Sequence, residues 1–247
     1  MNTTGNTILV SGGGSGIGLA LAQRWHDAGN IVIITGRNAA KLDAAITGRP
    51  NMSAMTLDVT DADAIATFAK DIVAKHPGLN VLVNNAGIMS SEDASAKRDL
   101  ADAEATVLTN VLGPIRLTDA LIDHLATQND AAIVNVTSGL AFVPLPKAPT
   151  YSATKAAMHS YSVALRIQLA GEVEVIELAP PAVRTDLTPG QSTRENYMPL
   201  DDFADEVMAL FAQAPTPEEI LVQNVLPLRH AEANGTVPQV LGMLASL

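Results

Sequence analysis

Short runs of apolar, mostly β-branched residues alternate along the chain with longer stretches whose apolar residues recur at helical spacing. The short runs predict buried strands, because their continuous apolar character indicates a sheet covered on both faces. The expected strands are Thr7–Val10, Ile31–Thr35, Met52–Leu57, Val81–Asn84, Ala132–Thr137 and Val173–Ala179. The longer stretches predict amphipathic helices at Gly18–Ala28, Ala62–Lys75, Ala101–Leu125 and Ser152–Leu169.

This alternation predicts an α/β fold of the Rossmann type, with a doubly wound, mostly parallel sheet of six or seven strands and helices on both faces. Clusters of Pro, Gly and Ser at Gly139–Pro149 and Pro180–Pro199 predict loops over a site. Further on, Asp201–Gln213 predicts a helix and Ile220–Val225 a short strand. Since no repeat or linker-like segment occurs, we expect one domain over residues 1–247, with substrate loops at about 139–149 and 186–200.

Composition narrows the classes of function. The chain has 247 residues, of which 47% are hydrophobic and 17% charged, and its net charge is −11. Such an acidic surface argues against binding to nucleic acid or to an anionic membrane. The absence of cysteine excludes disulfides and cysteine nucleophiles, the scattered histidines form no metal-binding motif, and no targeting segment or membrane span is apparent. We therefore expect a cytoplasmic protein without a metal.

A glycine-rich turn follows the first expected strand and opens the first expected helix. Glycines allow the backbone to approach a pyrophosphate closely, and the helix N-terminus offers unpaired N–H groups and a favourable dipole. A flexible loop is the alternative, but the order strand, turn, helix favours a nucleotide site. The predicted binding residues here are Gly12, Gly14, Ser15, Gly16, Ile17 and Gly18.

Tyr151 and Lys155 are four positions apart on an expected helix, so their side chains project from one face. A free tyrosine titrates near pH ~10, and a cation within about 4–6 Å lowers such a pKa by roughly 1–3 units. Lys155 is therefore expected to lower the pKa of Tyr151 and make it a general acid/base. Ser138, at the end of the fifth strand, is expected to hold the substrate oxygen, the alternative being a serine that caps a turn.

Together these motifs resemble the short-chain dehydrogenase/reductase family over about residues 7 to 190. The turn has the family's form [Ser/Thr]-Gly-x-x-x-Gly-x-Gly, and Tyr-x-x-x-Lys follows a strand-end serine at the family's spacing. The segments Thr35–Arg37 and Arg229–Gly235 are similar to the DltE-type branch of that family. The resemblance implies a nicotinamide-dependent oxidoreductase that forms a homodimer or homotetramer through Ala101–Leu125 and Ser152–Leu169.

The resemblance also implies roles for residues after the third, fourth and sixth strands. Asn110 would hold a water that links Lys155 to solvent, although a buried asparagine bonded to the backbone is the alternative. Other matching residues would flank the cofactor: Asn84, Ala86 and Gly87 beside the central sheet, Asp58 and Val59 at the adenine, and Pro180, Val183 and Thr185 at the nicotinamide. Pro181 departs from the family's glycine, which makes the last turn stiffer.

The choice between NADP and NAD depends on the end of the second strand. A carboxylate there would bind the ribose 2′-hydroxyl and repel a 2′-phosphate, but Arg37 and Asn38 occupy this place and no carboxylate precedes Asp43. We therefore expect NADP(H) to be preferred. Many NADP-using relatives carry a second basic residue in the glycine turn, where this chain has Ser15, so use of NAD(H) stays open.

The sequence thus predicts a carbonyl reductase or alcohol dehydrogenase that moves hydride between NADP(H) and a small ketone or aldehyde and its alcohol. The two loops predict a pocket for an apolar, uncharged substrate. Two alternatives are an NADP(H)-binding sensor without turnover and an epimerase or dehydratase that uses Tyr and Lys. The expected pocket residues are Leu140, Phe142, Val143, Leu145, Leu187, Tyr197 and Met198.

Overall fold

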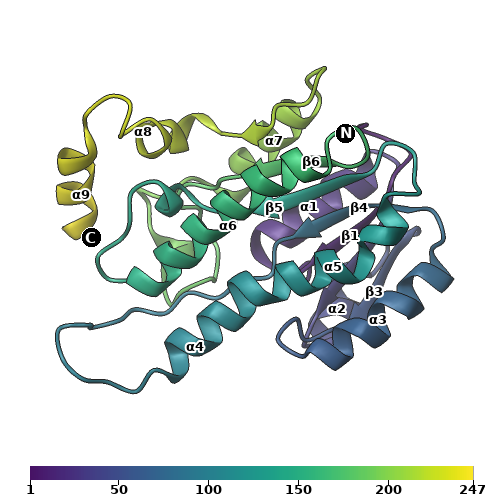
Figure 1. Ribbon diagram of the computed structural model, residues 1–247, viewed down its shortest axis with the longest axis horizontal. Helices are drawn as coiled ribbons and strands as arrows, with labels where there is room; N and C mark the ends of the chain where they lie inside the picture. The colour runs from purple at the N-terminus through teal and green to yellow at the C-terminus, as the bar shows by residue number, and fades with distance from the viewer. Residues whose placement is uncertain (247) are drawn as a thin grey trace.

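The computed structural model describes residues 1–246 and has a central sheet between two layers of helices (Figure 1). Its seven strands are ordered β3-β2-β1-β4-β5-β6-β7 and pair in parallel, which confirms the predicted doubly wound fold. The order reverses between β1 and β4, where such sheets open a ligand crevice at their carboxyl ends. The strands are β1 Thr7–Ser11, β2 Ile31–Gly36, β3 Met52–Thr56, β4 Leu79–Asn84, β5 Ala132–Val136, β6 Glu174–Leu178 and β7 Glu219–Ile220.

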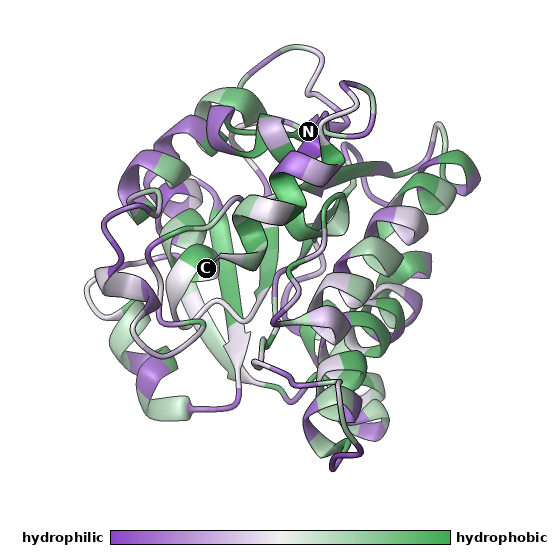
Figure 2. Ribbon diagram, turned by 90° about the vertical axis from the view of Figure 1, so that its left-hand side faces the viewer, coloured by the Kyte–Doolittle hydropathy of each residue, from purple (hydrophilic) through white to green (hydrophobic). Residues whose placement is uncertain are grey.

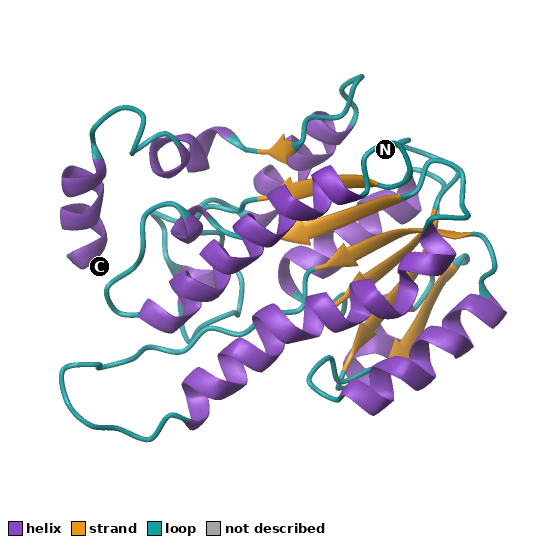
Figure 3. Cartoon of the chain, in the orientation of Figure 1, coloured by secondary structure: helices purple, strands orange, loops and turns teal. Residues whose placement is uncertain are grey.

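Alternation along β1 divides the core between the two faces of the sheet. Ile8 and Val10 pack on one face with Trp25 and Phe203, whereas Leu9 belongs to the cluster on the other face. Because both faces are covered, the strands consist of nearly continuous apolar residues. Figure 2 shows these hydrophobic strands between helices of mixed hydropathy, and Figure 3 shows the strands between the helical layers.

The longer helices cover both faces of the sheet, and shorter helical turns lie in the loops. The structure adds an eight-residue helix, α2, between β2 and β3, with Asn38 as its N-cap. None of the described helices is long and apolar enough to span a membrane. The helices are α1 Gly16–Asp27, α2 Ala39–Ile46, α3 Ala62–Lys75, α4 Ala101–Val107, α5 Gly113–Leu125, α6 Pro149–Gln168, α7 Leu200–Phe211, α8 Leu226–Arg229 and α9 Val237–Ala245, with short turns η1 Leu108–Leu112, η2 Gly139–Ala141, η3 Gln191–Thr193 and η4 Gln223–Val225.

The prediction of one continuous helix over Ala101–Leu125 is wrong in one respect. A π-helical turn, η1, separates α4 from α5 and contains Asn110. Pro114 has no N–H to donate to the Asn110 carbonyl four residues earlier, so a regular α-helical ladder cannot continue through this point. Such turns often occur at functional sites.

The C-terminal part also differs from the expectation. The predicted strand Ile220–Val225 is wrong beyond its first residue, because β7 ends at Ile220 and η4 follows. α8 and α9 then pack over the segment after β5, where Val143, Ala231 and Leu244 form a small apolar cluster. The predicted loop Gly139–Pro149 is also shorter in the structure, because α6 already begins at Pro149. Proline is favoured at the start of a helix.

Candidate active site

A cavity of about 690 Å³ opens at the carboxyl ends of the strands, between the turns that follow β1 to β6. Most of the residues that were predicted to bind a cofactor or to act in catalysis line this cavity. Asn84 and Asn110 do not line it. The predicted residues that line the cavity are Gly12, Gly14, Ser15, Gly16, Ile17, Gly18, Arg37, Asn38, Asp58, Val59, Ala86, Gly87, Ser138, Tyr151, Lys155, Pro180, Val183 and Thr185.

The glycine turn brings its backbone against the end of β4. Gly12 has a φ of +65°, and a Cβ on it would lie 2.8 Å from Ala86 Cα. A Cβ on Gly18 would lie 2.3 Å from Asn85 Nδ2, so neither position has room for a side chain. Ser15 precedes α1 and makes no side-chain cap, which leaves the first N–H groups of α1 free to bind an anion.

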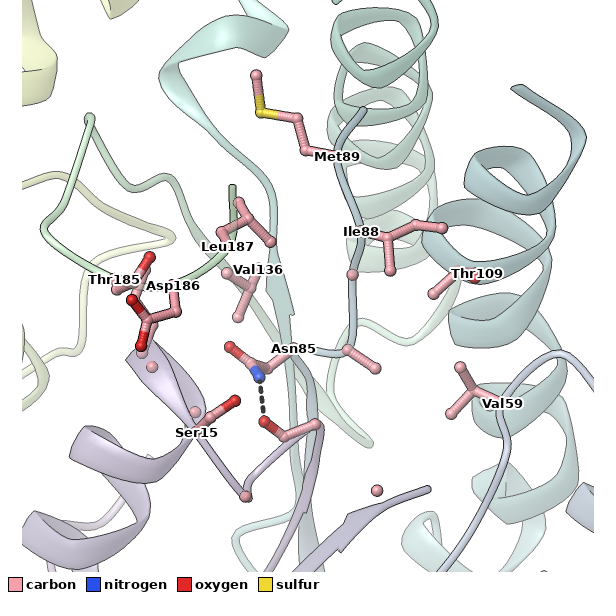
Figure 4. A pocket seen from close by; sticks show the side chains of 18 of the residues that line it. Ser15, Val59, Asn85, Ile88, Met89, Thr109, Val136, Thr185, Asp186 and Leu187 are labelled. Atoms are coloured by element: carbon pink, nitrogen blue, oxygen red, sulfur yellow. Dashed lines mark hydrogen bonds between the residues drawn. The ribbon is translucent and has the colours of Figure 1, made fainter. Parts of the chain in front are cut away.

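Asn85, which the sequence analysis did not single out, holds this turn in place. Its Nδ2 donates to the carbonyls of Ser11 and Gly12 at 2.9 and 3.1 Å. Ser11 Oγ in turn accepts from the backbone N–H groups of Asn85 and Ala86 at 3.0 and 3.1 Å. Figure 4 shows Asn85 beside the turn that carries Ser15. The two asparagines at the end of β4, Asn84 and Asn85, therefore have different roles.

Asn84 lies behind the cavity wall and does not line it, so its role beside the cofactor stays a prediction. It is buried, and its Nδ2 donates to Asn135 Oδ1 at 2.9 Å and Thr118 Oγ1 at 3.1 Å. Successive side chains of a strand point to opposite faces, so only one of two neighbouring asparagines can face the turn. Asn84 thus links β4 to β5 and α5.

Asn110 also lies behind the cavity wall and bonds the backbone there. Its Oδ1 accepts from Ile88 N, and its Nδ2 donates to Ile88 O, both at 2.9 Å. A Cβ on Gly87 would lie 3.4 Å from Asn110 Oδ1 and 3.7 Å from Lys155 Nζ, so Gly87 stands between these two groups. Asn110 therefore has the backbone contacts of the alternative interpretation, close to the lysine of the proposed relay.

Tyr151 and Lys155 are buried side by side on α6. Lys155 Nζ lies 5.5 Å from the Tyr151 ring centre and donates to Val136 O at 2.9 Å. Burial raises the pKa of Tyr151 to about 12, and the hydrogen bond with Ser138 acts in the opposite direction. Burial also lowers the pKa of Lys155 to about 8. The lowering expected from Lys155 is therefore outweighed in this structure, because the loss of solvent around the phenol dominates the pKa of Tyr151.

Ser138 follows β5 and lies beside Tyr151 of α6. Its hydroxyl accepts from Leu140 N at 3.1 Å, which is the turn-capping role of the alternative interpretation. The same side chain lies beside Tyr151, whose pKa it lowers, and lines the cavity. A single serine thus caps a turn and presents its hydroxyl beside the phenol.

The end of the cavity beside β2 and β3 is basic. Arg37 lines it together with Lys41, a second cation that is absent from the predicted set because α2 was not expected. Asn38 Oδ1 accepts from Lys41 N at 3.0 Å and so caps α2. Asp58 accepts from the backbone and hydroxyl of Thr60, and these bonds, with a smaller contribution from Arg37, keep its pKa below the usual value.

At the opposite end, Thr185 is held by Gln191, which is also absent from the predicted set. Gln191 Nε2 donates to Thr185 Oγ1 at 3.1 Å and to Val183 O at 2.9 Å, and the side chain is buried. The backbone bonds around Pro181 use the carbonyls of its neighbours, with Gly139 N donating to Pro180 O. Proline at position 181 is therefore compatible with this turn.

The apolar substrate pocket predicted from the two loops is largely wrong. Of the residues expected there, Leu187 lines the cavity. Val143 is covered by the C-terminal helices, and Met198 is part of the core on the α7 side. The apolar residues of these loops pack against helices whose positions could not be predicted from the sequence. The cavity wall near Leu187 is instead formed by Ile88, Met89 and Ser90, which follow β4 (Figure 4).

A possible ligand set for a metal lies outside this cavity. His159, Glu177 and Glu219 have ligand atoms within 4.8 Å of one another. Protein groups already bind these atoms: His159 Nδ1 lies 2.7 Å from Glu177 Oε2, and Arg229 Nε donates to Glu219 Oε2 at 2.9 Å. The absence of a metal from this protein stays a prediction.

Comparison with known proteins identifies the family. The family model for short chain dehydrogenases matches residues 6–196. The chain is 46% identical over 190 residues to the uncharacterized oxidoreductase DltE of Bacillus subtilis. The aligned region covers 76% of this chain and 75% of that protein. It is also similar to a short-chain dehydrogenase from Streptomyces avermitilis, with a TM-score of 0.83, 26% identity and 95% coverage of both chains.

A further solved structure holds a nicotinamide cofactor. This is a 3-ketoacyl-(acyl-carrier-protein) reductase from Brucella melitensis complexed with NADH, with a TM-score of 0.79, 25% identity, and coverage of 88% of this chain and 96% of that one. The matched region contains the glycine turn and the pair of Tyr151 and Lys155. The chain therefore belongs to the short-chain dehydrogenase family of NAD(P)-dependent oxidoreductases.

Proposed function

We propose that this protein is an NADP(H)-dependent carbonyl reductase that interconverts a ketone or aldehyde and its alcohol. One observation carries the proposal. Ser138, Tyr151 and Lys155 lie together and line the same cavity as the glycine turn. The free N–H groups of α1 and the close approach of the backbone at Gly12 fit a pyrophosphate. When bound, the nicotinamide supplies or accepts the hydride.

The side chains supply the proton. The hydroxyls of Ser138 and Tyr151 can both donate to the carbonyl oxygen and stabilise the negative charge that develops on it. With a pKa raised to about 12, Tyr151 is protonated at neutral pH and is ready to donate its proton to the alkoxide. Lys155, with a pKa lowered to about 8, is still mostly an ammonium at neutral pH and favours the phenolate that remains.

The basic end of the cavity supports a preference for NADP(H). Arg37 and Lys41 both line it, and Lys41 stands in the first turn of α2, whose N-terminus attracts anions. Lys41 thus provides the second cation that the glycine turn lacks. A 2′-phosphate would meet two positive side chains here, and charge-assisted bonds to phosphate are strong.

A neutral, compact carbonyl compound is the substrate class that we propose. Ile88, Met89 and Leu187 add apolar side chains to the cavity wall, and Asp186 adds a carboxylate beside Leu187 (Figure 4). Lys155 is the basic residue on this side of the described cavity, and its ammonium is bonded to Val136 O. An anionic substrate would therefore lack a free cation to pair with.

We further propose that the chain acts as one domain over residues 1–247 and assembles as a homodimer or homotetramer. Exposed apolar side chains on α4, η1 and α6 support the assembly, among them Val107 at 40% exposure, Val163 at 43% and Ile167 at 76%. Apolar residues that are exposed together mark interaction surfaces. The charge of −11 supports small molecules rather than nucleic acid or membrane as partners.

The test is oxidation of NADPH and of NADH, followed by absorbance, against a panel of aliphatic and aryl ketones. Wild type and Tyr151→Phe are compared side by side, because the variant keeps the ring and removes only the hydroxyl. We expect turnover with NADPH that Tyr151→Phe abolishes. Tight NADPH binding without turnover on any ketone would refute the proposal in favour of a sensor, and tightly retained cofactor with isomerised product would favour an epimerase.

A further inference from the structure

A buried carboxylate outside the motifs of the site contacts the helix that carries Tyr151. Glu92 lies in the irregular segment between β4 and α4, and its side chain is 3% exposed. Its Oε1 accepts from Thr150 N at 3.1 Å, and its Oε2 accepts from Thr150 Oγ1 at 2.7 Å and pairs with Arg98. Its backbone N donates to Lys147 O at 2.8 Å. The side chain of Glu92 therefore binds the first turn of α6, and its backbone binds the segment just before the helix.

The helix needs such a partner because it has no cap of its own. Its N-cap is Ala148, which has no polar side chain, and Pro149 follows at the first helical position. The first N–H groups of a helix lack acceptors within the helix, and a carboxylate there is favoured by both hydrogen bonding and the helix dipole. Glu92 supplies this acceptor from 58 positions earlier in the chain. Tyr151 is the next residue after the one that Glu92 binds.

The same segment forms part of the cavity wall. Ile88, Met89 and Ser90 line the cavity, and Asn110 binds both the N–H and the carbonyl of Ile88. The wall is therefore attached at one end to η1 through Asn110 and at the other end to α6 through Glu92. A shift of either attachment changes the distance between this wall and Tyr151.

We propose that Glu92 is a positioning residue that holds the Tyr151 turn of α6 and the wall Ile88–Ser90 in one arrangement, an inference that rests on the proposed reduction. Glu92 does not line the cavity and acts through Thr150. Lys155, one turn further along, is held separately by Val136 O. Loss of Glu92 therefore displaces Tyr151 relative to Ser138 and Lys155, while the binding of the cofactor is retained.

The kinetic test compares Glu92→Ala and Glu92→Gln with the matched control Asp93→Asn. Asp93 is the neighbouring exposed carboxylate, and its oxygen accepts only from Ser95 within the described residues. In single-turnover reduction of an accepted ketone, Glu92→Ala is expected to slow NADPH oxidation by roughly 10- to 100-fold, because small misplacements of a reacting group have effects of this size. The Kd of NADPH stays within about twofold, and Glu92→Gln, whose amide oxygen still accepts from Thr150, retains most of the rate.

The pH profile separates positioning from a structural role. If Tyr151 loses its contact with Ser138, the pKa of the phenol rises further, because Ser138 holds it down, and Tyr151 becomes a weaker acid. The rate profile of Glu92→Ala then lies below that of wild type at every pH at which wild type is active. A merely structural role predicts a lower Tm with an unchanged profile and an unchanged rate for the folded fraction. Such a result, or an equal rate in all variants, overturns the inference.

Hydrogen exchange followed by mass spectrometry tests the same contact without turnover. In Glu92→Ala, exchange is expected to rise in both segments 86–92 and 147–155, and in Asp93→Asn segment 147–155 stays protected. If wild type reduces no ketone, the proposed function fails, and the exchange result still decides whether Glu92 holds α6. If Glu92→Ala does not fold, Thr150→Val removes the hydroxyl donor alone; an unchanged rate and unchanged exchange in that variant would overturn the inference.

Discussion

Lys155→Met is expected to stabilise the fold while it removes activity. Burial lowers the pKa of Lys155 from 10.5 to about 8, so the folded chain holds this proton less tightly than the unfolded chain does. At pH ~7 the buried charge therefore costs about 3 kcal/mol of folding free energy, at about 1.4 kcal/mol per pKa unit. Methionine has a similar length without the charge, and the lost hydrogen bond to Val136 O costs about 1 kcal/mol. We expect a net gain of about 2 kcal/mol.

The pH dependence of this gain has a definite sign. Because the folded pKa is depressed, the cost is full below about pH 8 and disappears as the pH rises toward 10.5, where the unfolded chain also loses the proton. Between pH ~7 and ~9.5 the wild type should recover about 2 kcal/mol relative to Lys155→Met. The advantage of the variant is therefore large at neutral pH and small in alkali.

Urea unfolding measures this difference through the fluorescence of Trp25, the single and fully buried tryptophan. Wild type and Lys155→Met are compared at pH ~7 and ~9.5, with Lys70→Met on the exposed face of α3 as the control. The control should change the free energy of unfolding by less than about 0.5 kcal/mol at either pH. The reasoning is refuted if Lys155→Met is less stable than wild type at neutral pH, or if the difference does not change with pH.

Three further outcomes are expected. Lys41→Ala should raise the KM for NADPH by roughly 10- to 100-fold and leave that for NADH nearly unchanged, because it removes a charge-assisted contact to the 2′-phosphate; equal effects on both cofactors would contradict the assignment. Gly18→Ala should lower the free energy of unfolding by more than about 2 kcal/mol, since its Cβ would lie 2.3 Å from Asn85 Nδ2, whereas Gly242→Ala on α9, which has open space, should raise it by up to about 1 kcal/mol in thermal or urea unfolding. The rate of ketone reduction should fall as the pH rises through about 8, because Lys155 loses its proton there while Tyr151 stays protonated, and a flat profile from pH 7 to 9 would contradict this role.

The chemistry-bearing motifs could be placed on the fold from sequence because each depends on its own local chain. The glycine turn needs only its glycines and the start of α1 to form an anion site, and Tyr151 and Lys155 share a face because both stand on one helix. The apolar strands likewise predicted the parallel sheet, since strands covered on both faces have no polar side. These features reappear in the structure close to the expected residues.

Contacts between distant segments could not be predicted in the same way. Alternation places Asn85 rather than Asn84 on the turn, and this depends on the register of β4 beside β1. Val143 is buried because α8 and α9 cover its loop, and Glu92 caps α6 because a segment without periodicity folds back on it. A side chain's partner is set by which elements lie next to it in space, and the local pattern of hydrophobic and polar residues carries no such information. The glycine turn and the pair of Tyr151 and Lys155 could thus be identified from the sequence, whereas the walls that shape the cavity around them are formed by packing between distant segments.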